Sequence, residues 1–255
     1  MKSVWITALA KEPDVVKEII HQANKYGLEA NGHFWEDDLK QMAWLAVREK
    51  LKDKAVSLWV VLLSKDAMNP DVRYGLTLLS LAIKTERPEL PVLLIDPADR
   101  VTKEDLPGIF DTTPFVKGSG TKVAVKFAAM ANIPAKQVSV PYHLAVHANP
   151  GYGVWFEVGP CRDEDWTGVL FGVRQGEIKA HGCGIRGQIP EKCVVEYPIK
   201  GMKLASGVDE YLAWGIQNRL TASESYFVKV DGVVVSCLYG PMPDDVQADL
   251  HILRM

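Results

Sequence analysis

The sequence predicts an α/β domain built on a parallel sheet, followed by a mainly antiparallel β-rich domain. Residues 57–63 form an apolar run without polar alternation, which is typical of a strand buried on both faces of a parallel sheet. A helical pattern and a second apolar run over residues 91–96 follow, which completes a strand–helix–strand unit. Beyond about residue 140, short β-branched and aromatic runs are separated by Gly, Pro or Asp.

The first domain is expected to span residues 1–132, with strands and helices in alternation. Asn69, Pro70 and Asp71 supply a helix cap, a proline in the first turn and an acidic first turn for the central helix. Right-handed crossovers then place helices on both faces of a five-stranded sheet. The predicted strands are 4–9, 28–34, 56–63, 91–96 and 113–116, and the predicted helices are 13–26, 37 or 38 to 51, 70–87 and 121–131.

The second domain is expected to span residues 140–255, after a linker punctuated by Pro134 and Pro141. Asp231-Gly232 is a strong hairpin signal and Gln175-Gly176 a weaker one. One helix is predicted over residues 208–220. The predicted strands are 142–147, 153–158, 168–174, 177–182, 192–197, 225–230 and 233–238.

Composition narrows the possible partners. The chain has 255 residues, of which 47% are hydrophobic, and a net charge of −3. Without a dense basic patch, it lacks the electrostatic footprint of a nucleic-acid-binding protein. No window approaches the ~20 apolar residues of a membrane span, and the apolar start is too short for a signal peptide, so we expect a soluble, cytoplasmic protein with no membrane partner. The four cysteines form no C-x-x-C pair, which favours free thiols; no metal and no cofactor are predicted.

Residues 1–131 resemble the TIR domain family, a flavodoxin-like five-stranded signalling and NAD-cleaving fold. Gly27-Leu28 and the segment 32–38 look like that family's second strand and the acidic loop after it, and residues 60–64 look like its third strand with a terminal serine. The resemblance covers about half of the chain. It implies a five-stranded parallel flavodoxin/TIR-like sheet and a loop that mediates assembly.

One departure from that family concerns catalysis. Active TIR enzymes resemble one another in a glutamate on the helix after the third strand, and here that register falls at about Tyr74 and Gly75. Asp71 is better explained as a first-turn charge that complements the helix dipole. Without the carboxylate, cleavage of NAD loses its main stabilising group, so we predict no NAD-cleaving activity. A phosphoryl-accepting receiver domain would need clustered acids after the first strand, where only Glu12 is available.

A glycine-rich turn is the first candidate ligand site. Gly118, Ser119, Gly120 and Lys122 lie where the fifth strand should pass into a helix, whose free N–H groups favour a phosphate. Ser64 and Asp96 would lie at the same carboxyl edge of the sheet, where open α/β folds bind ligands. The spacing is neither a Walker motif nor G-x-G-x-x-G, and the alternative is a loop with a capping serine.

The loop after the second strand is the first candidate interface. It holds an imidazole beside carboxylates, a combination that suits acid–base chemistry near neutral pH. Alternatively, the aspartates cap a helix and the tryptophan anchors the loop. The resemblance favours assembly, so we expect a homo-oligomer or a protein partner at His33, Trp35, Glu36, Asp37 and Asp38.

The β-rich domain offers weaker candidates. His181, Cys183, Cys193 and Cys161 could ligate zinc or supply a nucleophilic thiol, but their irregular spacing favours packing roles. His143 and His147 share one strand face and are interpreted as structural. The aromatic segment 151–157 and Trp166 suit either a core or recognition of sugars or peptides.

Two functions follow from these patterns. The first is a bacterial signalling or sensing protein with a TIR-like interaction domain and a β-rich ligand- or partner-binding domain. The alternative is an enzyme acting on a nucleotide or nucleotide sugar at the carboxyl edge of the parallel sheet, with a nucleotide-like small molecule as its partner. The sequence leaves open whether the protein is an enzyme.

Overall fold

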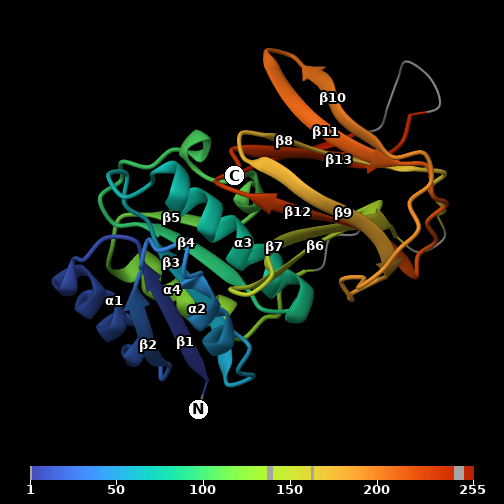
Figure 1. Ribbon diagram of the computed structural model, residues 1–255. Coiled ribbons are helices and arrows are strands. Elements are labelled where there is room, and N and C mark those ends of the chain that lie inside the picture. The colour runs from blue at the N-terminus through green and yellow to red at the C-terminus, as the bar shows by residue number, and fades with distance from the viewer. Residues whose placement is uncertain (1, 137–139, 162–163, 244–249) are drawn as a thin grey trace. The chain divides into compact units, whose positions relative to one another are not determined.

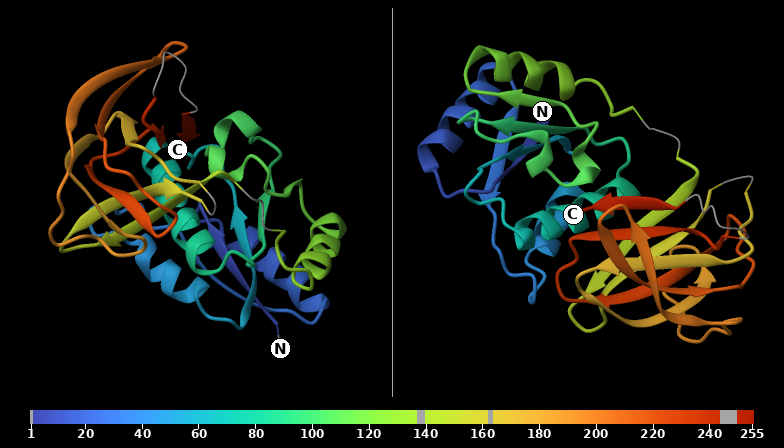
Figure 2. Two further views of the ribbon diagram at one scale, coloured as in Figure 1. Left: turned by 90° about the vertical axis from the view of Figure 1, so that its right-hand side faces the viewer. Right: turned by 90° about the horizontal axis from the view of Figure 1, so that it is seen from above.

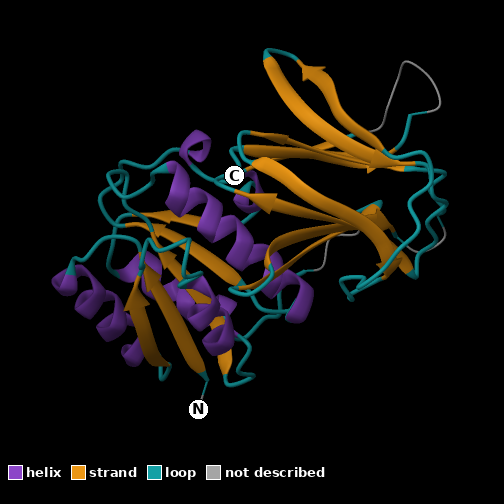
Figure 3. Ribbon diagram, viewed as in Figure 1, coloured by secondary structure: helices purple, strands orange, loops and turns teal. Residues whose placement is uncertain are grey.

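The computed structural model describes residues 2–136, 140–161, 164–243 and 250–255 (Figure 1). The chain divides into two compact units, Met1–Gln137 and Val138–Met255. Each unit has the character that the sequence predicts, because the first alternates strands with helices and the second consists of antiparallel strands (Figure 3). In the described chain no helix combines the length and apolarity needed to cross a membrane.

The first unit contains a five-stranded parallel sheet. Its strands lie in the order β2-β1-β3-β4-β5, which is the flavodoxin-like order. This confirms the predicted fold class of the N-terminal half. The strands are β1 (Ser3–Ala8), β2 (Glu29–Phe34), β3 (Val56–Leu62), β4 (Val92–Asp96) and β5 (Phe115–Lys117).

Four α-helices cover the two faces of this sheet (Figure 3). They are α1 (Pro13–Lys25), α2 (Trp44–Leu51), α3 (Pro70–Glu86) and α4 (Thr121–Met130), and the short 3-10 helices η1 (Lys103–Asp105) and η2 (Gly108–Phe110) precede β5. The predicted start of α3 is confirmed: Val72 N–H donates to Asn69 Oδ1 at 2.9 Å, and Pro70 opens the helix.

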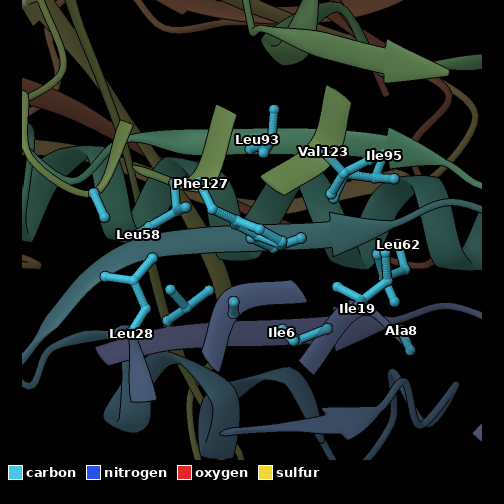
Figure 4. Close-up of a cluster of buried hydrophobic side chains, with 14 residues drawn as sticks. Ile6, Ala8, Ile19, Leu28, Leu58, Leu62, Leu93, Ile95, Val123 and Phe127 are labelled. Carbon is cyan, nitrogen blue, oxygen red and sulfur yellow. The ribbon is translucent and has the colours of Figure 1, made fainter. Parts of the chain in front are cut away.

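The core of the first unit lies on both faces of β3. Leu58 and Val60 join a cluster that includes α1 and α4 side chains such as Phe127 (Figure 4). On the opposite face Trp59 is fully buried, and its indole N–H donates to Thr7 Oγ1 at 2.9 Å. Burial on both faces explains why residues 57–63 show no polar alternation.

The second unit packs two antiparallel sheets face to face (Figure 2). The rings of Phe156 and Phe171, one from each sheet, lie 5.2 Å apart in the core between them. One sheet has the order β6-β7-β12-β9 and the other β10-β11-β8-β13-β14. The strands are β6 (Tyr142–Asn149), β7 (Gly153–Pro160), β8 (Val169–Arg174), β9 (Glu177–Ile185), β10 (Ile199–Ser206), β11 (Asp209–Ile216), β12 (Glu224–Asp231), β13 (Ser236–Pro241) and β14 (His251–Arg254).

The helix predicted over residues 208–220 is wrong, because this segment forms β11. Strand β11 pairs with β10 through a turn in which Gly207 has a φ of 61°, and its other edge pairs with β8. A helix makes its backbone hydrogen bonds within itself and cannot pair with a strand on each side. An extended strand hydrogen-bonds to both of its neighbours. Leu212, Trp214 and Ile216 therefore share one face by the two-residue period of a strand.

Several boundaries and turns also differ from expectation. Helix α2 begins at Trp44 instead of near Asp38, since Met42 has a φ of 52°, a left-handed conformation that interrupts a helix. Residues 192–197 form bends and irregular structure instead of the predicted strand. Gln175-Gly176 and Asp231-Gly232 do turn the chain, but each connects strands of different sheets, so neither closes a hairpin.

The buried ring on α4 gives a test of this core. Phe127→Ala should weaken the hydrogen-exchange protection of the β3 amides by about 3 to 5 kcal/mol, because a fully buried aromatic ring is lost and leaves a cavity. Val125→Ala on the same helix is the control, since that side chain is 55% exposed. Equal losses in the two variants would contradict the packing described.

Candidate functional site

The carboxyl edge between β1 and β3 is nearly filled by side chains. The cavity there is only about 30 Å³, and Ala8, Glu12, Leu62, Ser64 and Arg100 are among its lining residues. That volume suits a single water molecule and not a nucleotide. Among the described residues that line this cavity Glu12 is the only acid, so they include no carboxylate pair for phosphoryl transfer.

Asp96 holds the loop that follows β4. Its side chain is 1% exposed, and its Oδ2 accepts a hydrogen bond from Val101 N–H at 2.6 Å. Its backbone carbonyl accepts from Gly118 N–H at 2.8 Å. The carboxylate is thus occupied in positioning the backbone between β4 and β5.

The glycine-rich turn is separate from this small cavity. Gly118 and Gly120 have φ values of 82° and 80°, which glycine adopts without strain, and Gly120 stands at the N-terminus of α4 without a side-chain cap. Ser119 lies between them. Lys122 borders a different, shallow depression together with Phe115 and Lys126. The structure does not bring Ser64 and Lys122 into one cavity, and their ligand-binding role stays a prediction.

A second cavity, the aromatic cavity, lies beside β1, β2 and α2 and is larger than the one between β1 and β3. Its volume is about 250 Å³. Three of the five predicted interface residues, His33, Trp35 and Glu36, line it. Its full lining is Trp5, His33, Phe34, Trp35, Glu36, Ala43, Trp44, Ala46, Val47 and Lys50.

His33 is fixed as a neutral ring in this cavity. The Trp5 indole N–H donates to His33 Nδ1 at 3.2 Å, and the two rings stack with centroids 5.8 Å apart. Burial lowers the pKa of His33 to about 4, so the ring carries one proton at pH 7. Because Nδ1 accepts, that proton is on Nε2, and the ring has no free lone pair with which to act as a general base.

Two further tryptophans complete the aromatic wall. Trp35 and Trp44 are 7% and 3% exposed. Within the described part of the chain neither indole N–H has a hydrogen-bond partner, and the same holds for His33 Nε2. The Trp35 ring packs against α3 at Gly75, where an added Cβ would lie 2.8 Å from a ring carbon. Gly75 therefore makes room for Trp35 at the register where the resemblance to TIR enzymes would place a glutamate.

The two aspartates of the loop stabilise its conformation. Asp38 Oδ1 accepts from Gln41 N–H at 2.9 Å, and Asp37 Oδ2 accepts from Asn69 Nδ2 at 3.2 Å. The first bond closes the turn that precedes α2, and the second joins the loop to the start of α3. Glu36, Asp37 and Asp38 are exposed, so they form an acidic surface next to the aromatic cavity.

A buried carboxylate in the β-rich unit was not singled out from the sequence. Glu157 is 1% exposed, and its oxygens lie 2.5 Å from His147 Nε2 and 3.3 Å from His143 Nε2. Gly187 N–H also donates to it at 2.8 Å. Burial by itself would raise the pKa of Glu157, but the close His143 and His147 side chains and the hydrogen bond from Gly187 N–H outweigh burial and hold the pKa well below its usual range. The signal was a single acid within the apolar run 154–158.

This arrangement predicts a loss of stability in acid. An unfolded-chain glutamate has a pKa of about 4.3, and the folded pKa is lower, so the stabilisation is present above about pH 5 and is lost as the pH falls. Glu157→Gln should cost about 1.5 to 3 kcal/mol at pH 7 and flatten that dependence, as measured by hydrogen exchange of the β7 amides. Glu191→Gln, at an exposed position, is the control. An unchanged acid profile in Glu157→Gln would contradict this role.

His181 and Cys183 are not arranged as a catalytic pair. His181 Nδ1 lies 2.8 Å from the Tyr226 hydroxyl, and the imidazole packs edge-on against Trp214. Cys183 Sγ donates to Val194 O at 3.4 Å, and burial together with the neighbouring Cys193 raises the pKa of Cys183 to about 11. Among the described residues no cluster of three potential metal ligands is found.

The thiols should accordingly differ in reactivity. Alkylation with iodoacetamide at pH 7, followed by mass spectrometry, should modify the exposed Cys193 first and Cys183 much more slowly, because the thiolate is the reactive form. Fully buried Cys237 is the internal control and should stay unmodified in the folded chain. Labelling of Cys183 at the rate of Cys193 would revive the nucleophile hypothesis.

Comparisons with known proteins add little beyond the fold. No family model and no curated protein matches the chain. A CheY-like protein from Pseudomonas aeruginosa aligns at 14% identity over 55% of this chain and 100% of that chain, with a TM-score of 0.32. A putative pilus assembly-related protein from Burkholderia pseudomallei aligns at 10% identity over 51% and 91%, with a TM-score of 0.34.

A third solved structure is a 3-dehydroquinate dehydratase-like protein from Bifidobacterium longum. It aligns at 14% identity over 51% of this chain and 96% of that chain, with a TM-score of 0.30. At such scores these likenesses carry no argument about activity. The assignment of a flavodoxin-like sheet rests on the strand order itself.

Proposed function

We propose that the chain is a bacterial signalling or sensing protein whose α/β domain binds a small molecule in the aromatic cavity. The observation that carries this proposal is the position of the cavity under the predicted interface loop. His33, Trp35 and Glu36 line the cavity, while Asp37 and Asp38 continue directly into the exposed acidic surface. Under this proposal the loop serves as a TIR-like interaction surface whose shape depends on whether the cavity is occupied.

Occupation of the cavity can change the conformation of the loop because only a few contacts hold the loop in place. The segment 35–38 is tied down by the packing of Trp35 on Gly75 and by the bonds of Asp37 and Asp38. A ligand that shifts the Trp35 ring acts on the same short segment that presents the acidic side chains. Differential binding of a ligand to two loop conformations is what changes the affinity of a surface for its partner.

The enzyme alternative has less support. The cavity at the carboxyl edge has room for about one water, and the Asp96 carboxylate accepts a hydrogen bond from the Val101 backbone N–H. His33 has no free lone pair with which to act as a general base. A nucleotide or nucleotide sugar would need a site that opens well beyond this volume.

In the proposal the β-rich domain binds a ligand or partner, and the signalling output is self-association of the α/β domain or binding of another protein.

A thermal-shift screen tests the proposal. Planar aromatic molecules, nucleotides and sugars are added to the full chain, and each hit is followed by light scattering. A ligand at 100 times its dissociation constant stabilises the folded state by about 2.7 kcal/mol, which is a measurable shift. We expect an aromatic hit that changes the oligomeric state and whose shift is lost in Trp44→Ala.

Two outcomes would count against the proposal. A nucleotide shift that persists in Trp44→Ala would favour the enzyme at the sheet edge. A chain that remains monomeric with every hit, and that captures no partner through the acidic loop, would remove the signalling role. Phe127→Ala, buried in the core and outside the cavity lining, is the control for loss of stability alone.

A further inference from the structure

We infer that the aromatic cavity recognises a small aromatic carboxylate, because its buried polar groups are hydrogen-bond donors that lack acceptors. This inference rests on the proposed function and specifies the ligand class of the same site. It follows from three side chains, His33, Trp35 and Trp44, which together line the cavity and each have a nitrogen without a partner.

The protonation of these nitrogens is set by the local hydrogen bonds. An indole nitrogen can only donate, which settles Trp35 and Trp44. His33 is a donor as well, because the Trp5 N–H occupies Nδ1 and leaves the proton on Nε2. All three unpartnered groups are therefore N–H donors, and a ligand that supplied further donors would satisfy none of them.

Leaving these donors unpaired is unfavourable. A buried donor without a partner loses the hydrogen bond that it makes with water in the unfolded chain, and the three nitrogens here have almost no contact with solvent that would compensate. A carboxylate has two oxygens and about four acceptor positions, so one such group can accept from several donors at once. Because the three nitrogens are shielded from solvent, the aromatic rings must shift as a ligand enters.

The size and faces of the cavity favour a flat ligand. A volume of about 250 Å³ holds roughly eight water molecules at about 30 Å³ each, which fits one aromatic ring with a small substituent. Trp5 and His33 already stack on each other, and aromatic faces prefer a further ring in an offset or edge-on arrangement.

The charges at the cavity permit an anion. Lys50 and Glu36 are both exposed lining residues of opposite sign, and His33 is neutral at pH 7 because burial lowers its pKa to about 4. The lining therefore carries no net negative charge to repel a carboxylate, and Lys50 provides a cation for it. A cationic ligand would instead leave the three N–H groups unpaired.

Benzoate and benzamidine provide a matched pair of probes. They share one ring and nearly the same shape, but benzoate only accepts hydrogen bonds whereas benzamidinium only donates them. Isothermal titration of the full chain at pH 7 should show benzoate binding at least about tenfold more tightly. The preference should be the same at pH 6 and pH 8, since His33 does not titrate in that interval.

Two variants identify the donors. Trp44→Phe and Trp35→Phe each keep an aromatic ring and remove one N–H. Each should weaken the binding of benzoate by about fivefold to tenfold and leave the affinity for benzamidine unchanged. Trp155→Phe is the matched control, because that indole lies outside the cavity lining and donates to Tyr152 O at 3.1 Å. Circular dichroism confirms that each variant is folded.

The outcomes separate this inference from the proposed function. Equal or tighter binding of benzamidine, or an unchanged benzoate preference in both Phe variants, would overturn the ligand class while the sensing role survives. The ligand class would also be overturned if benzoate does not bind while a molecule of another class gives a thermal shift that is lost in Trp44→Ala. If no molecule in the screen depends on Trp44, both the inference and the proposed function fail.

Discussion

The α/β unit depends on the burial of β3 on both of its faces. Val60 and Val61 point in opposite directions, and both are fully buried. A strand of this kind is stable only when helices cover the two sides of its sheet, because neither face can be left in water. The helices α1 and α4 meet this need on one face through Ile19, Val123 and Phe127, and the elements around Trp59 meet it on the other.

The aromatic cavity is a consequence of how the second face is covered. Trp5 and Thr7 alternate with the core residues of β1, so they point to the side where α2 and α3 pack. Helix α2 has eight residues and begins only at Trp44, so the segment before it covers this side with a loop. Trp35 fills part of the space against Gly75, and the remainder is the cavity.

The sequence was sufficient where local pattern and tertiary context agree. The apolar run of β3 and the cap at Asn69 each act locally, and both predictions are confirmed by the structure. It was insufficient where pairing between distant segments decides the outcome, as in β11, whose partners β10 and β8 include residues some 40 positions upstream. The start of α2 was missed for a local reason, the left-handed backbone at Met42. Methionine is not a residue type that indicates this conformation in a sequence.

The candidate site shows the same division. The predicted interface loop was identified from the sequence, but the cavity beneath it needs Trp5 beside His33, and these residues are brought together by the parallel register of β1 and β2. The glycine turn and Ser64 were expected to share one site because both follow strands, yet Ser64 and Lys122 line two different cavities. Local sequence thus locates polar loops better than it locates the spaces between them.

The side chains around the aromatic cavity pack well but leave N–H donors without hydrogen-bond partners among the described residues. A phenylalanine at position 35 or 44 would supply a comparable apolar face without an orphaned N–H, and so would avoid a penalty of about 1 to 3 kcal/mol per group. Three such penalties among the residues that line one cavity are a local inconsistency, and inconsistencies of this kind are expected at functional sites. Hydrogen bonds from these groups to a ligand would remove the penalty, and the free energy released on binding is then available to shift the loop that carries Glu36, Asp37 and Asp38.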